Sequence, residues 1–163
     1  MFLDPEYNDD ERKVIEMAPN DLQKVLPCVK FWIWPKGQSP AGYKERYIHI
    51  KKVPSGCSSD VGKTKTEGAQ TLSLAQRCVT LGTVIHEMIH ALGFHHEHSQ
   101  PDRDKYVTVN LQNVQDNRYN AFRKYTDKEV STFGVPYNTK SLMHYSSKDF
   151  SKDGKPTIVT KVC

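Results

Sequence analysis

The fold of this chain follows most directly from one segment, His86-Glu87-Met88-Ile89-His90-Ala91-Leu92-Gly93-Phe94-His95-His96. Apolar residues recur here and just before it at the spacing of an α-helix: Leu81, Val84, Ile85, Met88, Ile89 and Leu92. This periodicity predicts an amphipathic helix over 83–92, bounded by Gly82 and Gly93. We expect its apolar side to pack in the core and the opposite side, which carries His86 and His90, to face a cleft.

Residues four apart on a helix stand one turn above each other, so His86 and His90 can direct ring nitrogens at one ion. A zinc ion suits this arrangement, with zinc–nitrogen bonds of about 2.0 to 2.1 Å. Glu87 is rotated one step and can accept a proton from a water that the metal activates. Gly93 can take a positive φ and end the helix, which lets His96 reach the metal as a third ligand.

Two alternatives bear on this segment. A helix rich in histidine and glutamate can be an ordinary solvated face, although the correctly spaced third histidine speaks against that interpretation. His95 and His98 flank His96, and His95 could be the third ligand instead. The spacing after Gly93 favours His96.

The full pattern H-E-x-x-H-x-x-G-x-x-H is the metzincin signature. Further motifs narrow the choice: His96-Glu97-His98, Asp102-Arg103-Asp104, Tyr106-Val107 and Ser141-Leu142-Met143-His144-Tyr145. With them, the chain resembles the astacin family of zinc metalloendopeptidases over about residues 14–159. The resemblance implies one zinc ion per chain, with Met143 under the three imidazoles. It also implies that Tyr145 is a switchable metal ligand that stabilises the oxyanion of the transition state.

The fold implied by the resemblance is α+β and zincin-like. A twisted N-terminal sheet and two helices would lie over a zinc cleft, followed by an irregular C-terminal half. We expect one catalytic domain, 1–163, with subdomains of about 1–92 and 93–163. From the residues alone we predict a helix over 9–25 that Pro19 kinks or splits, and strands over 31–34, 47–50 and 71–74.

Four dispersed cysteines, with no C-x-x-C pair, suggest disulfides and an oxidising compartment, although four free thiols are the alternative. Three pairings are possible. The resemblance implies a Cys57–Cys78 bridge and a second bridge from Cys28 to a C-terminal cysteine, for which Cys163 is the candidate. Family domains also begin with a strand before the first helix and end with a helix, and we expect this chain to lack both.

The resemblance also implies a substrate strand. Gly68, Ala69, Gln70 and Thr71 match the family's edge strand, to which an extended peptide would add through main-chain hydrogen bonds. The alternative is an ordinary sheet strand without a substrate role. Glu97 has a structural role in the family, where it meets the N-terminus of the mature enzyme. We expect Asp102, Arg103 and Asp104 to brace their loop by ion pairs rather than to act in catalysis.

The composition sets the remaining limits. A net charge of +4 comes from scattered residues, so we expect no nucleic-acid partner, and no apolar run approaches the about 18 residues that span a membrane. We predict a secreted, monomeric zinc endopeptidase that acts on proteins or peptides. Two alternatives remain open: an inactive zinc-binding domain that recognises proteins, and a zinc hydrolase with a different substrate.

Overall fold

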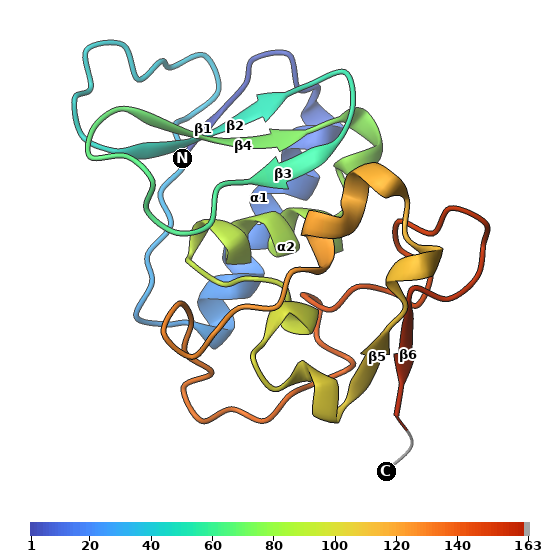
Figure 1. Ribbon diagram of the computed structural model, residues 1–163. Helices are drawn as coiled ribbons and strands as arrows, with labels where there is room; N and C mark the ends of the chain where they lie inside the picture. The colour runs from blue at the N-terminus through green and yellow to red at the C-terminus, as the bar shows by residue number, and fades with distance from the viewer. Residues whose placement is uncertain (162–163) are drawn as a thin grey trace. The chain divides into compact units, whose positions relative to one another are not determined.

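The computed structural model describes residues 1–161 and divides into two compact units. The first unit comprises Met1–Phe94, and the second begins at His95. Figure 1 traces the chain through both, with 3-10 helices labelled η in the text. The elements of the first unit are β1 Phe2–Leu3, α1 Asp9–Val25, β2 Tyr47–Lys52, β3 Cys57–Ser59, β4 Ala69–Leu74, η1 Gln76–Cys78 and α2 Leu81–Ala91.

Helix α1 begins at a capping box. The side chain of Asn8 accepts a hydrogen bond from the Glu11 amide, and the Glu11 carboxylate accepts one from the Asn8 amide, each at 2.9 Å. These bonds satisfy amides that have no partner within the helix. The predicted helix over 9–25 is confirmed as α1, and Pro19 does not split it, because α1 runs unbroken to Val25. Pro19 instead lies on the buried face with Ile15.

The four strands of the first unit form one sheet in the order β1-β2-β4-β3. Strands β1, β2 and β4 are parallel, with Tyr47 opposite Ala69, and β3 runs antiparallel to β4. Two predicted strands are confirmed as β2 and β4. The strand predicted over 31–34 is wrong: these residues form no ladder, and one of their amides, that of Trp34, donates to the Met1 carbonyl at 2.9 Å.

The expectation that no strand precedes the first helix is also wrong. Phe2 and Leu3 form β1, which pairs in parallel with β2 and places Phe2 opposite His49 and Leu3 opposite Ile50. A strand of two residues carries almost no periodic signal, so the pattern of apolar residues could not reveal it.

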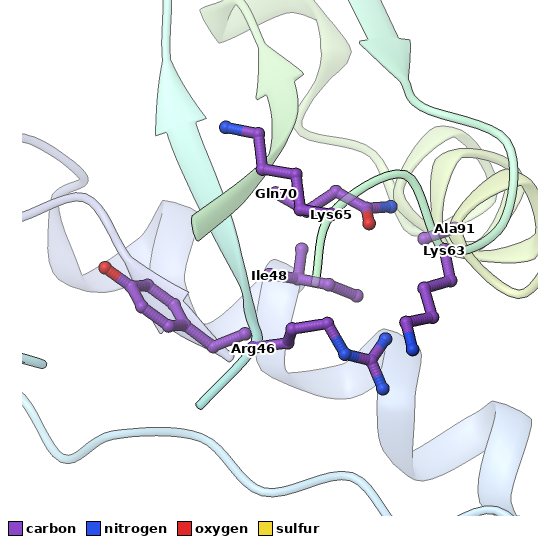
Figure 2. A pocket seen from close by; sticks show the side chains of 7 residues that line it. Arg46, Ile48, Lys63, Lys65, Gln70 and Ala91 are labelled. Atoms are coloured by element: carbon purple, nitrogen blue, oxygen red, sulfur yellow. The ribbon is translucent and has the colours of Figure 1, made fainter. Parts of the chain in front are cut away.

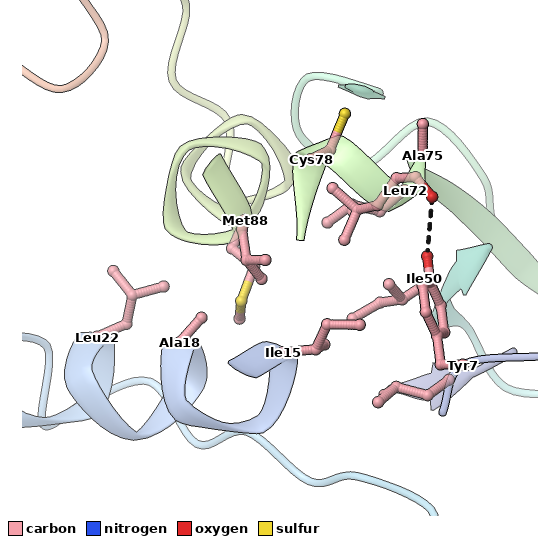
Figure 3. Packing of buried hydrophobic residues seen from close by; sticks show 12 residues of the cluster. Tyr7, Ile15, Ala18, Leu22, Ile50, Leu72, Ala75, Cys78 and Met88 are labelled. Carbon is pink, nitrogen blue, oxygen red and sulfur yellow. Dashed lines mark hydrogen bonds between the residues drawn. The ribbon is translucent and has the colours of Figure 1, made fainter. Parts of the chain in front are cut away.

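Both helices lie on the same side of the sheet (Figure 1). Their apolar faces and the inner face of the sheet form one core, which Figure 3 shows in part: Leu3, Tyr7, Ile15, Ala18, Leu22, Ile50, Leu72, Leu74, Ala75, Cys78, Val84 and Met88. The Tyr7 hydroxyl crosses this core to donate to the Leu74 carbonyl at 3.2 Å (Figure 3). Burial of these side chains is the main stabilising term for the unit.

The disulfides agree with the expectation as far as residues 1–161 extend. Cys57 and Cys78 form the predicted bridge, which links β3 to η1. Cys28 is exposed and forms no disulfide within the described residues. Cys163 lies outside them, so the Cys28–Cys163 pairing stays a prediction.

The second unit is mostly irregular, as expected for the C-terminal half. Its elements are η2 Glu97–Ser99, η3 Arg103–Lys105, β5 Val107–Val109, η4 Leu111–Asn113, η5 Asp116–Phe122 and β6 Ile158–Thr160. Strands β5 and β6 form an antiparallel pair. The unit has its own buried cluster: Val107, Val114, Phe122, Tyr137 and Ile158. Among the described residues of the whole chain, no helix is both long and apolar enough to cross a membrane.

Candidate metal centre

Helix α2 places the first two histidines. It begins at Leu81, two residues before the predicted start, because Thr80 caps it and accepts a hydrogen bond from the Thr83 amide at 3.3 Å. Val84 and Met88 are buried in the core of the unit, as the apolar periodicity predicts. Their burial fixes the rotation of the helix about its axis, and hence the side on which the histidines lie.

The end of α2 is a Schellman turn at Gly93. The Gly93 amide donates to the His90 carbonyl at 2.8 Å, and the Phe94 amide donates to the Ile89 carbonyl at 3.2 Å. Gly93 has a φ of 108°, a conformation that side chains with a Cβ rarely adopt, and its Cα lies close to Gly62. The predicted sharp stop after the second histidine is therefore confirmed.

This turn also orients His90. The Phe94 carbonyl lies 2.7 Å from Nδ1 of His90. A carbonyl can only accept, so Nδ1 carries the hydrogen and Nε2 of the neutral ring carries the lone pair. A hydrogen bond of this kind, at the nitrogen opposite the ligating one, is typical of metal-binding histidines.

The histidines of the continuous segment 86–96 converge. His86, His90 and His96 each offer a ring nitrogen, and these atoms lie within 4.8 Å of one another. The rings of His86 and His90 are nearly perpendicular, with centroids 4.7 Å apart. His95, the alternative third ligand, packs instead on Tyr125, with ring centroids 4.3 Å apart. Three imidazole nitrogens are a donor set that zinc accepts, with a coordination position left for a reactant.

Glu87 is buried in the first unit, with 5% of its surface exposed. Its carboxylate accepts a hydrogen bond from the Ser59 amide in β3, and its Oε2 atom has no hydrogen-bond partner within residues 1–161. Burial raises the pKa of Glu87 to about 7, and the Ser59 hydrogen bond opposes that rise. A carboxylate with one oxygen held and the other unpartnered is suited to accept and return a proton near neutral pH.

In the second unit, the residues around Met143 are tied to the chain that follows His96. The Glu97 amide donates to the Met143 carbonyl at 2.9 Å, and the Glu97 carboxylate accepts from the Asn138 amide at 2.8 Å. The Tyr145 ring packs on the His96 ring, with centroids 4.5 Å apart. The unit thus brings three of the predicted site residues together: His96, Glu97 and Tyr145.

His144 and Tyr106 stand in motifs that carry the family resemblance, but the sequence did not indicate that they hold Tyr145 in place. Nδ1 of His144 lies 2.6 Å from the Tyr145 carbonyl, so it must donate, and Nε2 of His144 then accepts from the Tyr137 hydroxyl at 2.6 Å. Tyr137 stacks in turn on Tyr106, with ring planes 3° apart. No spacing rule links these positions, because they are brought together only by the folded loops.

The ion pairs predicted to brace the loop after His96 form at Arg103 and Asp104 but not at Asp102, whose buried Oδ1 atom has no hydrogen-bond partner within residues 1–161. One nitrogen of Arg103 donates to the carbonyls of His98 and Phe122, at 3.0 and 2.6 Å. Asp104 pairs with Arg103 at 3.3 Å and with Lys124 at 2.6 Å. These contacts fix the course of the chain beyond the third histidine.

The predicted edge strand is wrong. Strand β4, which contains Ala69, Gln70 and Thr71, pairs with β2 along its whole length and with β3 over its second half. Gln70 is 8% exposed, and its side chain hydrogen-bonds to the backbone of Gly62 and Thr64 in its own unit. The antiparallel edge strand of this sheet is β3. Sequence pattern alone could not reveal this order, because it does not specify which strands are neighbours.

A family model described as Astacin, a family of peptidases, matches residues 1–163. Zinc metalloproteinase nas-14 of Caenorhabditis elegans is 40% identical over 162 residues, 98% of this chain and 30% of the relative. Blastula protease 10 of Paracentrotus lividus is 48% identical over 107 residues, 66% of this chain and 18% of the relative. This chain thus spans less than a third of the length of either relative.

A solved structure is also similar: High choriolytic enzyme 1, a hatching enzyme zinc-protease from Oryzias latipes. Its TM-score is 0.79 at 28% identity, over 98% of this chain and 74% of that chain. The family match covers the whole sequence, including the segment whose three histidines converge. This chain belongs to the astacin peptidase family.

Proposed function

We propose that the chain is the catalytic domain of a secreted zinc endopeptidase, in which the two units act together as one domain. His86, His90 and His96 hold the zinc ion in this proposal. The observation that carries the proposal is the convergence of three ring nitrogens within 4.8 Å of one another. In addition, Nδ1 of His90 donates a hydrogen bond to the Phe94 carbonyl, as is typical of metal-binding histidines. When bound, zinc would supply Lewis-acid polarisation of the scissile carbonyl and of the attacking water.

Glu87 moves the protons in this proposal. Its unpartnered Oε2 takes one proton from the attacking water while the water oxygen bonds to the peptide carbon. The same carboxyl then gives that proton to the peptide nitrogen, and the carbon–nitrogen bond breaks. A pKa of about 7 allows Glu87 to act first as base and then as acid near neutral pH.

Strand β3 is the proposed substrate strand, in place of residues 68–71. It is the antiparallel edge of the sheet, and its residue Ser59 donates to the Glu87 carboxylate. An extended peptide that added to this edge through main-chain hydrogen bonds would lie beside Glu87. Main-chain recognition favours unfolded or extended protein segments as substrates.

The proposed location is extracellular. The Cys57–Cys78 disulfide is of the kind that persists in oxidising compartments. The similarity to a hatching enzyme zinc-protease supports this location. We propose a monomer that takes protein or peptide substrates.

The test is the rate at which zinc-loaded protein cleaves an unfolded protein, compared between wild type and Glu87→Gln. We expect Glu87→Gln to retain one zinc per chain and to lose activity by a factor of about 10² to 10⁴. The matched control is Glu67→Gln, the same substitution at an exposed glutamate, which should leave the rate unchanged. A folded, zinc-loaded wild type that cleaves nothing would instead favour a protein-recognising domain without activity.

A further inference from the structure

The first unit contains a basic pocket of about 190 Å³. Three cationic side chains line it, among other residues: Arg46, Lys63 and Lys65, beside Tyr47, Ile48 and Gln70 (Figure 2). No carboxylate is among the lining residues. None of the three cations forms an ion pair with any residue in 1–161. The pocket therefore concentrates positive charge that the unit does not neutralise.

The backbone that carries two of these cations is held in place. Lys63 and Lys65 lie on the loop between β3 and β4, and the buried amide of Gln70 holds that loop. Its Nε2 donates to the Gly62 carbonyl at 2.7 Å, and its Oε1 accepts from the Thr64 amide at 3.1 Å. A ligand that bound here would not have to order the loop first.

The third cation, Arg46, lies next to the start of β2. In Figure 2 its guanidinium and the ammonium of Lys63 extend to the same side of Ile48. The like charges of Arg46 and Lys63 repel each other, and an anion placed beside both removes that repulsion, whereas the Lys65 ammonium extends the other way in Figure 2. The planar fork of Arg46 can also donate two parallel hydrogen bonds to a tetrahedral oxyanion.

Aromatic side chains adjoin the pocket through Tyr47. The Tyr47 ring contacts those of Trp34 and Tyr43, with centroids 5.4 and 6.1 Å away, and Trp34 contacts Trp32 at 4.7 Å. Trp32 is 60% exposed and Tyr43 is 47% exposed. Exposed rings of this kind offer flat apolar faces with polar edges, on which the faces of sugar rings can stack.

We propose that this pocket binds the sulfate groups of an extracellular polysaccharide, whose sugar rings stack on the neighbouring aromatic side chains. Cations beside exposed rings would also suit single-stranded nucleic acid. The Cys57–Cys78 disulfide favours the polysaccharide, because it is typical of proteins outside the reducing cytosol and nucleus. This inference goes beyond the proposed peptidase activity and uses none of its residues.

The test is the affinity of the full chain for a heparin-derived octasaccharide at about 0.15 M salt. We expect the variant R46Q/K63Q/K65Q to bind about tenfold more weakly or worse, since it removes the three positive charges that line the pocket. The matched control R77Q/K128Q/K148Q removes the same three charges from exposed positions outside the pocket, and it should weaken binding by less than about twofold. An equal loss of affinity in both variants would overturn the proposal, because it would show that binding depends on the overall charge and not on this pocket.

Further arms identify the ligand class. A desulfated octasaccharide, polyglutamate and a single-stranded oligonucleotide should each bind at least about tenfold more weakly than the sulfated probe. If any of them matches the sulfated probe, the assignment to a sulfated polysaccharide fails. Trp32→Ala should weaken octasaccharide binding about threefold, and no change would contradict the stacking contribution.

Two controls complete the experiment. Thermal unfolding of R46Q/K63Q/K65Q should match that of wild type, because the three side chains are exposed and unpaired within the described chain. The same binding series on a Glu87→Gln background should give the same result, because the proposal requires no cleavage. A failure of the peptidase proposal is therefore distinguishable from a failure of this one.

Discussion

Glu87 and His98 show how burial acts on single ionisable groups. Burial raises the pKa of the Glu87 carboxyl to about 7 and lowers the pKa of the His98 imidazole to about 4. The direction differs because burial disfavours the charged form, which is the deprotonated carboxylate in one case and the protonated ring in the other. Glu87 is thereby adjusted for proton transfer, whereas His98 stays neutral and bonds through Nε2 to the Ala121 carbonyl at 2.9 Å.

His98 should make the metal-free protein sensitive to acid. Its pKa is about 4 when folded and 6.5 in the unfolded chain, so the unfolded chain binds more protons between these values. The contribution of His98 to the free energy of unfolding is therefore fully present above pH 6.5 and is lost as the pH falls toward 4. From pH 7 to 5 we expect this residue to account for about 2 kcal/mol of lost unfolding free energy. Urea unfolding of wild type and His98→Phe at both pH values measures it, and equal pH-dependent losses in the two proteins would refute the assignment.

Tyr145 should contribute to the rate rather than to substrate binding. In Tyr145→Phe the ring contacts with His96 and His98 remain, and only the hydroxyl is lost. If the hydroxyl donates to the transition-state oxyanion, kcat should fall by a factor of about 10² with little change in KM. Steady-state kinetics on a peptide substrate checks this, with Tyr119→Phe, an exposed tyrosine, as the control. A raised KM at constant kcat would assign Tyr145 to ground-state binding.

At the scale of the element, the ends of the helices are determined by a few side chains. Helix α1 starts at the Asn8–Glu11 capping box, and the Glu11 carboxylate also pairs with Lys52 of β2 at 2.8 Å. Helix α2 ends at Ala91, and the turn at Gly93 that follows brings the Phe94 carbonyl to His90. The start of α1 is thus joined to the sheet, and the turn after α2 orients a proposed metal ligand.

The capping box should be measurable as stability. Asn8→Ala removes the acceptor for the Glu11 amide, and we expect the free energy of unfolding to fall by about 1 kcal/mol. Asn20→Ala, at an exposed position in the middle of α1, serves as control and should be neutral or slightly stabilising. Chemical unfolding measures the free energy of unfolding of both variants. Equal losses would show that the cap has no special role.

Two glycines of the α2 region should respond in opposite ways to alanine. Gly93 has a φ of 108°, so Gly93→Ala should cost about 1 to 3 kcal/mol of stability. Gly82 lies inside α2, and a Cβ there would meet nothing within 4 Å, so Gly82→Ala should stabilise by about 0.5 to 1 kcal/mol. Thermal unfolding of the pair tests both signs. A stabilising Gly93→Ala would mean that this backbone can relax out of its left-handed conformation.

At the scale of the whole molecule, each unit has its own buried cluster. The first combines a sheet, two helices and a disulfide, whereas the second relies on a short antiparallel ladder and on polar contacts among loops. Arg103 illustrates the second case, because its guanidinium bonds to two backbone carbonyls that lie far apart in sequence. Loops of this kind need such partners for their backbone polar groups.

The Cys57–Cys78 bridge should contribute strongly to the stability of the first unit. It joins residues 21 positions apart, and in the chain-entropy model such a loop is worth about 3 kcal/mol. We expect the double variant C57A/C78A to lose that amount in urea unfolding. Ser58→Ala, in the same strand, is the control. A loss below about 1 kcal/mol would mean that residual structure already restricts the unfolded chain.

The regular helices and the local part of the site were predictable because their signals are local. The turn-by-turn spacing of His86 and His90, the stop at Gly93 and the apolar face of α2 all depend on residues within a few positions of each other. Burial along α1 is less evident from the sequence: Val25, at its end, is 73% exposed, whereas Ile15 is fully buried. Burial also depends on what packs against a helix, and periodicity does not specify that partner.

Order in the sheet and long-range polar contacts were not predictable. The residues of β4 predict a strand, but its place between β2 and β3 follows from pairing across the sheet. The Ser59 hydrogen bond to Glu87 and the basic pocket likewise join positions far apart in the chain. Local pattern therefore determined the helices, the histidine spacing and the family, because those features repeat within one or two turns. Strand order, the environment of Glu87 and the basic pocket arose only on folding, because burial and charge proximity are properties of neighbours in space.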